Sequence, residues 1–229
     1  MLTQSNRFIP LLLLLASPSV CAPLSLNDIL AKLDQNVQSF RAMTAKIERL
    51  DYTAILKDSS RESGDILLLR RKGSQVEMRI NIRQPDIKNI GYAEKKVQIF
   101  LPKINIVQIY DVGKYDTLIS QGLLIGFGTT AQELQKSYNL KILAEEQIAG
   151  KASTRVELTP KGTSPLLSLK KIEVWFGNLD GYPVQQKLFE NSGDYKLATY
   201  TEMKINPPVK EQDVRLSLPK NVKKEYPSK

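Results

Sequence analysis

The sequence contains no histidine, and this absence removes several kinds of active site at once. Ser-His-Asp and Cys-His nucleophile systems, histidine-based zinc sites and the facial triad of iron enzymes all require that side chain. The sequence also contains a single cysteine, Cys21. A chain with one cysteine forms no intramolecular disulfide and no cysteine cluster for a metal. The composition therefore predicts a protein that is not an enzyme and that needs no cofactor or metal.

The first residues have the layout of a secretory signal. Arg7 is the single charge, the apolar stretch 8–16 contains five consecutive leucines, and small or turn-forming residues occupy 17–20. A membrane-spanning helix needs roughly 20 apolar residues, more than this run provides. The pattern predicts a cleaved signal peptide over residues 1–22 and export to the periplasm. Cleavage after Ser19 or Cys21 stays open, because Pro23 disfavours a cut after Ala22.

Cys21 raises the alternative of a lipid anchor. A lipoprotein signal has a small residue directly before the cysteine and an aliphatic residue three before it, whereas this chain has Val20 and Pro18. We therefore expect a soluble mature protein over residues 23–229, with the anchored form as the minor alternative.

The chain is basic, with a formal net charge of +9, and loss of the signal removes only Arg7. A positive charge favours contact with anionic surfaces. Export separates the protein from nucleic acid, so no nucleic-acid partner is expected. Lipid headgroups, acidic proteins and a simple gain in solubility all remain as interpretations of the charge.

Hydrophobic periodicity predicts one helix followed by many strands. Apolar residues recur at helical spacing over 26–41, after Ser25 and its capping partner Asp28. From 45 to 82 the period changes to two, with a hairpin turn at 72–74. Further strands are expected at 87–92, 97–101, 104–110, 140–148, 153–158, 169–176, 184–190, 195–205 and 214–218.

The middle of the chain interrupts the strands. Residues 118–128 are apolar and broken by glycines, and they lead into Thr130 and Glu133, a capping box that starts a short helix ending near Tyr138. We expect a mostly β (α+β) single domain, an antiparallel sheet that curls, with an N-terminal helix and an apolar insertion able to lie across one face.

Several local patterns, in this order, resemble the LolA-like family of periplasmic lipoprotein carriers. They are the opening 39–45, Ser-Phe-Arg-Ala-Met-Thr-Ala, after the helix, and the strand 64–70, Gly-Asp-Ile-Leu-Leu-Leu-Arg. A strand then runs to Gln-Pro at 84–85, the apolar stretch 123–126 precedes the short helix, and 156–161 is Val-Glu-Leu-Thr-Pro-Lys. The sequence departs from the family at Arg71, where proline is common, and in having no tryptophan over 94–102.

The resemblance implies an incomplete antiparallel β-barrel whose helices form a lid over an apolar cavity. It also implies a carrier, expected to be a monomer, that binds the acyl chains of lipoproteins or related lipids. Such a carrier receives its cargo from inner-membrane release machinery and delivers it to an outer-membrane acceptor. The alternative function is a lipid- or protein-sensing module that regulates a membrane partner. The candidate ligand-binding and lid residues are Arg70, Ile66, Leu68, Met78, Ile80, Leu123, Leu124, Ile125 and Phe127.

Arg70 is the most specific of these candidates. Ile66, Leu68 and Arg70 share one face of a strand, so the guanidinium ends an apolar row. If that row faces the cavity, Arg70 needs carbonyl or carboxylate partners, which we expect from the lid backbone. Alternatively, the strand ends there and Arg70 is a solvated turn residue beside Arg71. For the apolar residues, ordinary core packing is the alternative to ligand contact.

Overall fold

The computed structural model describes residues 24–71, 75–113, 125–162 and 169–227. The predicted signal peptide, the turn 72–74, Leu123 and Leu124 lie outside these ranges. The described residues form two α-helices, α1 (Leu26–Ser39) and α3 (Ala131–Ser137), two short 3₁₀ helices and one sheet. The strands are β1 (Ala42–Thr53), β2 (Asp58–Arg70), β3 (Val76–Gln84), β4 (Lys88–Ala93), β5 (Lys96–Leu101), β6 (Ile106–Asp111), β7 (Tyr138–Ile148), β8 (Lys151–Pro160), β9 (Leu169–Gly177), β10 (Pro183–Glu190), β11 (Tyr195–Ile205) and β12 (Lys223–Glu225).

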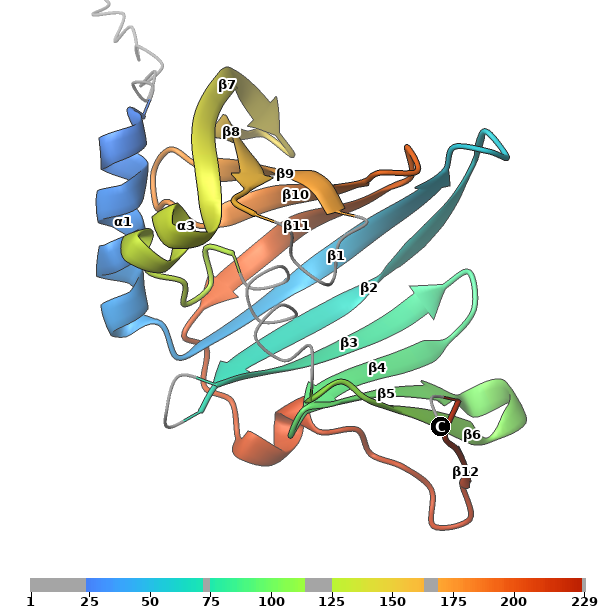
Figure 1. The fold of residues 1–229 in the computed structure, drawn as a ribbon. Helices are drawn as coiled ribbons and strands as arrows, with labels where there is room; N and C mark the ends of the chain where they lie inside the picture. The colour runs from blue at the N-terminus through green and yellow to red at the C-terminus, as the bar shows by residue number, and fades with distance from the viewer. Residues whose placement is uncertain (1–23, 72–74, 114–124, 163–168, 228–229) are drawn as a thin grey trace, which may run out of the picture.

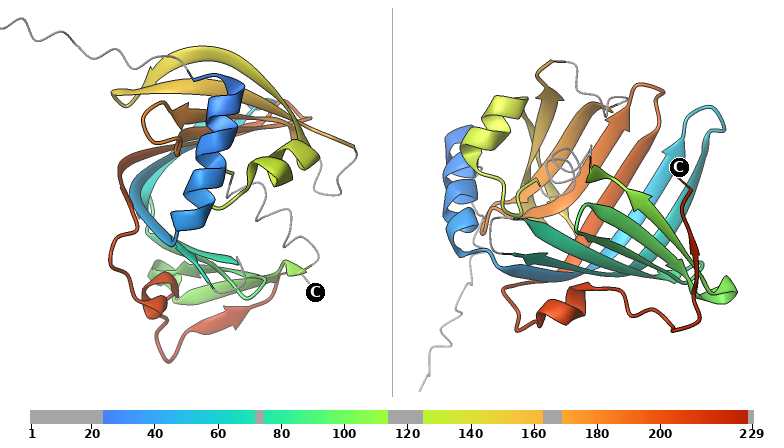
Figure 2. Two further views of the ribbon diagram at one scale, coloured as in Figure 1. Left: turned by 90° about the vertical axis from the view of Figure 1, so that its left-hand side faces the viewer. Right: turned by 60° about the horizontal axis from the view of Figure 1, so that its bottom comes forward.

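The sheet is continuous but does not close into a barrel. Its strand order is β12-β6-β5-β4-β3-β2-β1-β11-β10-β9-β8-β7, and all neighbours are antiparallel except β12 and β6. The sheet curls around an inner face, and α1 and α3 lie against one end of that face (Figures 1 and 2). The predicted incomplete antiparallel barrel with helices on one side is therefore confirmed.

The two helices begin where the sequence predicts. The Ser25 hydroxyl accepts from the backbone N–H of Asp28, whose carboxylate accepts from Ser25 in return. Thr130 and Glu133 make the same reciprocal bonds at the start of α3. The predicted helix over 26–41 is two residues too long, since Phe40 already has extended backbone and leads into β1.

The inner face is apolar over most of its area. Cross-strand partners on it include Met43 with Leu68, Leu68 with Met78, and Ile66 with Ile80. A first cluster of buried inner-face residues joins Phe40, Met43, Ala45, Ile47, Ile66, Leu68, Val76, Met78, Ile80, Ile82, Tyr92, Phe127, Tyr182 and Tyr200. A second cluster packs α1 and α3 against the inner face of β8 and β9, through residues such as Leu33, Leu134 and Ile172.

The outer face is crossed by the C-terminal residues (Figure 2). The predicted strand over 214–218 is wrong, because Glu211–Val214 is a 3₁₀ helix and irregular chain follows it. Its apolar residues instead pack on the sheet: Val214 is buried against Ala42, Leu67 and Leu69. Residues 207–222, which we call the strap, therefore cover β2 from the side opposite to α1.

The chain from Ile125 to Phe127 is fastened to the inner face by a buried chain of hydrogen bonds. The Tyr200 hydroxyl donates to Gln186 Oε1 at 3.1 Å, and Gln186 Nε2 donates to the Ile125 carbonyl at 2.9 Å. Gly126 has φ +84°, and a Cβ there would lie 2.4 Å from Pro183 Cγ, so only glycine fits. The Phe127 ring contacts those of Phe40, Tyr182 and Tyr200.

Gly64 provides a first test of the sheet. It lies where the register of β2 and β3 shifts, and a Cβ there would lie 2.0 Å from the Asn81 carbonyl oxygen. Gly64→Ala should therefore lower the free energy of unfolding by about 1–3 kcal/mol, the usual range for overpacking. Urea denaturation measures the change, with the neighbouring Ser63→Ala as control. If the two variants were equally stable, the close approach of Gly64 to the Asn81 carbonyl oxygen would be contradicted.

Tyr200 provides a test by pH. Complete burial raises the pKa of its phenol far above the ordinary value. A raised pKa in the folded state means that the stability contribution is present below the unfolded pKa of about 10 and is lost as pH rises beyond it. Wild-type stability should therefore fall above that pH, and Tyr200→Phe should flatten the fall. The control is Tyr195→Phe, and equal slopes in the wild type and Tyr200→Phe would refute the buried phenol.

Candidate functional site

The inner face divides into a covered part and a partly exposed part. Ile66, Leu68, Met78 and Ile80 belong to the covered part, with 7% exposure or less. The register of β2 and β3 places these four side chains on one apolar face, as predicted. In the described structure their neighbours are other core residues, so any contact with a ligand stays a prediction.

Ile125 and Phe127 also lie in the core. Ile125 is fully buried in the cluster under α1, and Phe127 is 1% exposed in the first inner-face cluster. The hydrogen bond from Gln186 and the three aromatic rings around Phe127 hold this segment against the sheet. These two residues anchor the end of the predicted apolar insertion 118–128, whose Leu123 and Leu124 lie outside the described residues.

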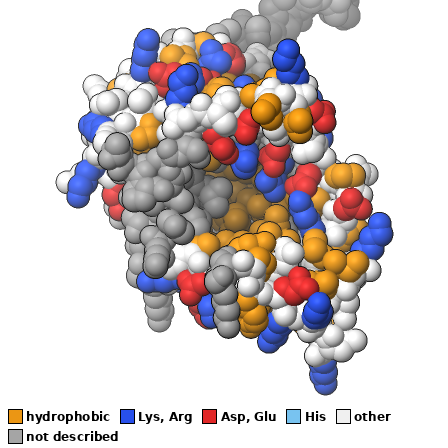
Figure 3. Space-filling model, turned by 45° about the vertical axis from the view of Figure 1, so that its right-hand side comes forward, with side chains coloured by type: hydrophobic (Ala, Val, Ile, Leu, Met, Phe, Trp, Pro, Cys, Tyr) orange, Lys and Arg blue, Asp and Glu red, His pale blue; other side chains and the backbone are white. Residues whose placement is uncertain are grey.

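The partly exposed part of the inner face lies on β4, β5 and β6. The register places Tyr92 opposite Val97, Ile90 opposite Ile99, and Val97 opposite Tyr110. Ile90, Val97, Ile99 and Tyr110 are half-buried apolar side chains on this face. Figure 3 shows a hollow lined by hydrophobic side chains, with charged side chains at its edge. The sequence predicted these strands but not that they, rather than β2 and β3, remain open.

Arg70 lies at the end of β2 and is partly buried. Its Nη1 donates a hydrogen bond to the backbone carbonyl of Val37, in the last turn of α1. That turn, all of it described, contains no basic side chain. The guanidinium therefore supplies the positive charge that favours a helix C-terminus. This carbonyl belongs to the N-terminal helix, and a bond from Arg70 to the lid backbone stays a prediction.

Arg71, the next residue, faces the other side of the sheet. Its guanidinium pairs with Glu77 at 2.8 Å and with Glu211 of the strap at 2.6 Å. The hydrogen bond from Arg71 to Glu211 is the main reason that the pKa of Arg71 is raised. The two arginines thus form their contacts on opposite faces of the sheet. Arg70 contacts α1, and Arg71 contacts the strap.

A row of charged side chains crosses the inner face beyond the apolar clusters, and sequence reasoning missed it. Arg49 follows Ile47 at the period of two and lies opposite Glu62, while Asp51 lies opposite Lys196. Lys88 also lies on this face, since it is paired with Ile82. We call this row the charged belt, and in strand order it consists of Lys88, Glu62, Arg49, Asp51, Lys196 and Glu190.

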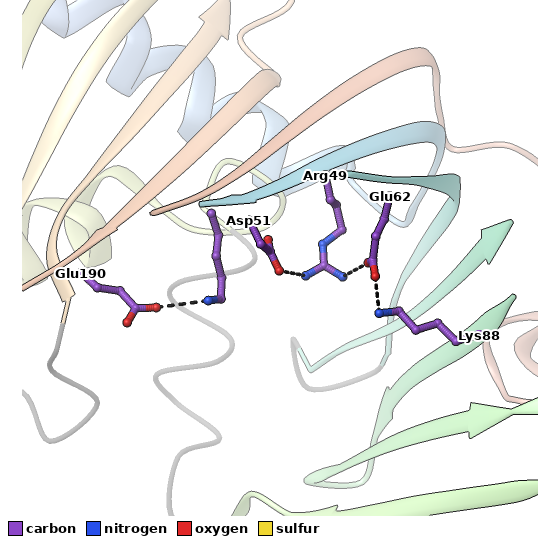
Figure 4. A network of polar contacts seen from close by, with 6 residues as sticks. Arg49, Asp51, Glu62, Lys88 and Glu190 are labelled. Carbon is purple, nitrogen blue, oxygen red and sulfur yellow. Dashed lines mark hydrogen bonds and ion pairs between the residues drawn. The ribbon is translucent and has the colours of Figure 1, made fainter. Parts of the chain in front are cut away.

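Ion pairs connect neighbouring members of the charged belt, except between Asp51 and Lys196. Lys88 pairs with Glu62, Arg49 lies 3.3 Å from Glu62 and 3.6 Å from Asp51, and Lys196 lies 3.2 Å from Glu190. Figure 4 shows Asp51, Arg49, Glu62 and Lys88 pointing toward one another, with Glu190 apart from them. Counting every second residue beyond Ile47 on β1 identifies Arg49 and Asp51 from the sequence. The cross-strand partners on β10 and β11 can be identified only from the fold.

Other features of the described chain are less suited to a ligand with long apolar chains. A cavity of about 480 Å³ lies on the outer face, but its lining includes the charged residues Glu48 and Arg61 and the polar Thr199. In residues 24–71, 75–113, 125–162 and 169–227 no cluster of His, Cys, Asp and Glu could hold a metal ion. None of the described helices is long and apolar enough to cross a membrane.

Comparison with known proteins gives matches in structure only. No family profile and no curated protein matches the sequence. An uncharacterised conserved protein from Thermus thermophilus superposes with a TM-score of 0.54 at 12% identity, over 87% of this chain and 98% of that one. MucB superposes with a TM-score of 0.52 at 14% identity, over 83% of this chain.

The extent of these matches differs. This chain spans 62% of the MucB chain. A LolA superfamily protein from Nitrosomonas europaea also matches, at 13% identity and a TM-score of 0.40, over 85% of this chain and 99% of that one. At such identities the two higher matches establish a shared fold. The chain thus has the fold of the Thermus thermophilus protein and of MucB, an open antiparallel sheet with helices on its inner face.

Proposed function

We propose that the protein binds the acyl chains of lipoproteins or related lipids in its inner hollow and carries them toward the outer membrane. The observation that supports this proposal is the half-buried apolar surface of Ile90, Val97, Ile99 and Tyr110 on the inner face. Concave, mostly apolar surfaces are the usual sites for apolar ligands. An apolar face left open in a soluble domain needs an occupant, because such patches otherwise favour aggregation.

The proposed setting is the periplasm. The signal-like segment 1–22 would export the chain, which would then work as a monomer without catalysis. Its proposed partners are release machinery at the inner membrane and an acceptor at the outer membrane. The fold and the sequence resemblance support this assignment.

Ile99 tests the hollow directly. Ile99 lies between Ile90 on β4 and Gln108 on β6, and Ile99→Gln replaces its apolar side chain by a polar one. The loss of this apolar contact with an acyl chain costs roughly 1.5 kcal/mol. We expect the variant to bind a fluorescent fatty acid about tenfold more weakly than the wild type does. The measurement is a titration that follows the fluorescence of the probe.

The matched control is Ile109→Gln, because Ile109 is also half-buried but lies on the outer face opposite Gln98. Equal losses in the two variants would mean that the hollow is not the site. Lipid that co-purifies with the protein, identified by mass spectrometry, would support the carrier. Protein that is free of lipid and binds no fatty acid would favour the alternative of a sensing module.

Arg70 tests the release of cargo. The hypothesis is that entry of a ligand breaks the bond from Arg70 to the Val37 carbonyl and that its return drives unloading. A charged hydrogen bond of this kind contributes roughly 1.5–3 kcal/mol, enough to shift an open-closed equilibrium by one to two decades. Arg70→Leu should retain ligand and transfer it slowly to acceptor vesicles, and Arg70→Lys should be intermediate.

Arg41→Leu is the control for this experiment, because Arg41 is exposed at the start of β1. Arg71→Leu is unsuitable, since it would leave the buried Glu77 without its partner. If Arg70→Leu unloads as fast as Arg41→Leu, Arg70 has no part in release.

A further inference from the structure

The charged belt alternates in sign across the strands. From β4 to β10 the order is Lys88, Glu62, Arg49, Asp51, Lys196 and Glu190, so each cation is followed by an anion; β1 supplies both Arg49 and Asp51, and β3 supplies no member. Alternation of this kind lets every group pair with its neighbour, and most of them do. A belt that served only to stabilise the sheet would be expected to pair along its whole length.

The pairing fails at one place. Asp51 and Lys196 lie directly opposite each other on β1 and β11, yet they form no ion pair in the described part of the chain. Lys196 turns to Glu190 instead. Asp51 is held only loosely, with Oδ2 at 3.6 Å from Arg49.

The other oxygen of Asp51 is the clearest sign that something is missing. Oδ1 itself is buried, although the Asp51 side chain as a whole is 38% exposed, and among the described residues this oxygen has no hydrogen-bond partner. Leaving a buried charged acceptor unsatisfied is costly, so such an atom is normally paired in the working state of a protein. The geometry thus leaves a position for a hydrogen-bond donor, with a cation across from it on the neighbouring strand.

The belt also lies where the polar end of an amphiphile would be. It occupies the same face as the apolar clusters and begins one step beyond Ile47 on β1. In the space-filling view, charged side chains border the apolar hollow (Figure 3). A lipid with its acyl chains in that hollow would have its head at the edge.

We propose that the break between Asp51 and Lys196 is a headgroup site for a zwitterionic phospholipid whose ammonium carries N–H groups. The ammonium donates to Asp51 Oδ1, and the phosphate lies against the Lys196 ammonium. This assignment rests on the proposed function, because it takes the apolar hollow to be the acyl-chain site. It names the class of lipid head that the carrier prefers.

The test compares three phospholipids with identical acyl chains, each labelled with a fluorophore on one chain. Phosphatidylethanolamine has an ammonium with N–H groups, phosphatidylcholine has an ammonium without them, and phosphatidylglycerol has no ammonium. The purified wild-type protein should bind phosphatidylethanolamine about tenfold more tightly than the other two, as expected for one charged hydrogen bond.

Two variants separate the contributions. Asp51→Asn should bring phosphatidylethanolamine to the level of phosphatidylcholine while leaving binding of a fluorescent fatty acid unchanged. Lys196→Gln should weaken all three phospholipids together, because each carries the phosphate. Glu48→Gln is the control, since Glu48 is an exposed acid on the outer face of the same strand.

Each outcome decides one question. Equal binding of the three lipids by the wild type, or a preference that survives in Asp51→Asn, would overturn the headgroup site. Binding of the fatty acid without binding of any phospholipid would overturn it as well and leave the acyl-chain site standing. Failure to bind the fatty acid and all three phospholipids would instead overturn the carrier function.

Discussion

The whole architecture follows from a mismatch between the area of the inner face and the length of the helix that covers it. Twelve strands at a spacing of about 4.8 Å would span more than 50 Å if the sheet were flat. The 14 residues of α1 form a rod of about 21 Å. Curling the sheet reduces the mismatch but does not remove it. One end of the inner face is therefore covered by helices, and the apolar side chains on β4, β5 and β6 stay partly open.

The polar groups on that face are arranged around the same mismatch. Where the face is covered, the few buried polar atoms are satisfied, as in the chain from Tyr200 through Gln186 to the Ile125 carbonyl. Further along β1, beyond Ile47, the charged residues Arg49 and Asp51 replace apolar ones at the same period-two positions. Arg70 marks the other boundary, at the point where the covered face meets the end of α1. The proposed site lies between these two boundaries.

Local features of the fold could be predicted from the sequence, because they depend on neighbours in the chain. Both capping boxes and most strands follow from residue types a few positions apart. The strand predicted over 214–218 failed for the opposite reason. Its alternating residues belong to irregular chain on the outer face, and only the distant leucines of β2 explain why Val214 is apolar.

The candidate site could be predicted only in part. The apolar row of β2 followed from the period of the strand, and the need of Arg70 for a polar partner followed from the cost of burying a charge. The opposition of Asp51 and Lys196 could not be found in this way, since it depends on the pairing of β1 with β11 across most of the chain. The extent to which each apolar residue is covered likewise depends on where α1 ends.

The strap has a consequence for the thermodynamics of any ligand in the hollow. Leu67 and Leu69 of β2 are buried against Val214 on the outer side, while Ile66 and Leu68 are buried on the inner side. Arg71 joins the same strand to Glu211 by an ion pair. A strand held from both sides loses little backbone freedom when a ligand arrives, so binding would require little ordering of the protein. The strand β2 is therefore preorganised, and under the proposed function adjustment to ligands of different size falls to the partly open strands β4, β5 and β6.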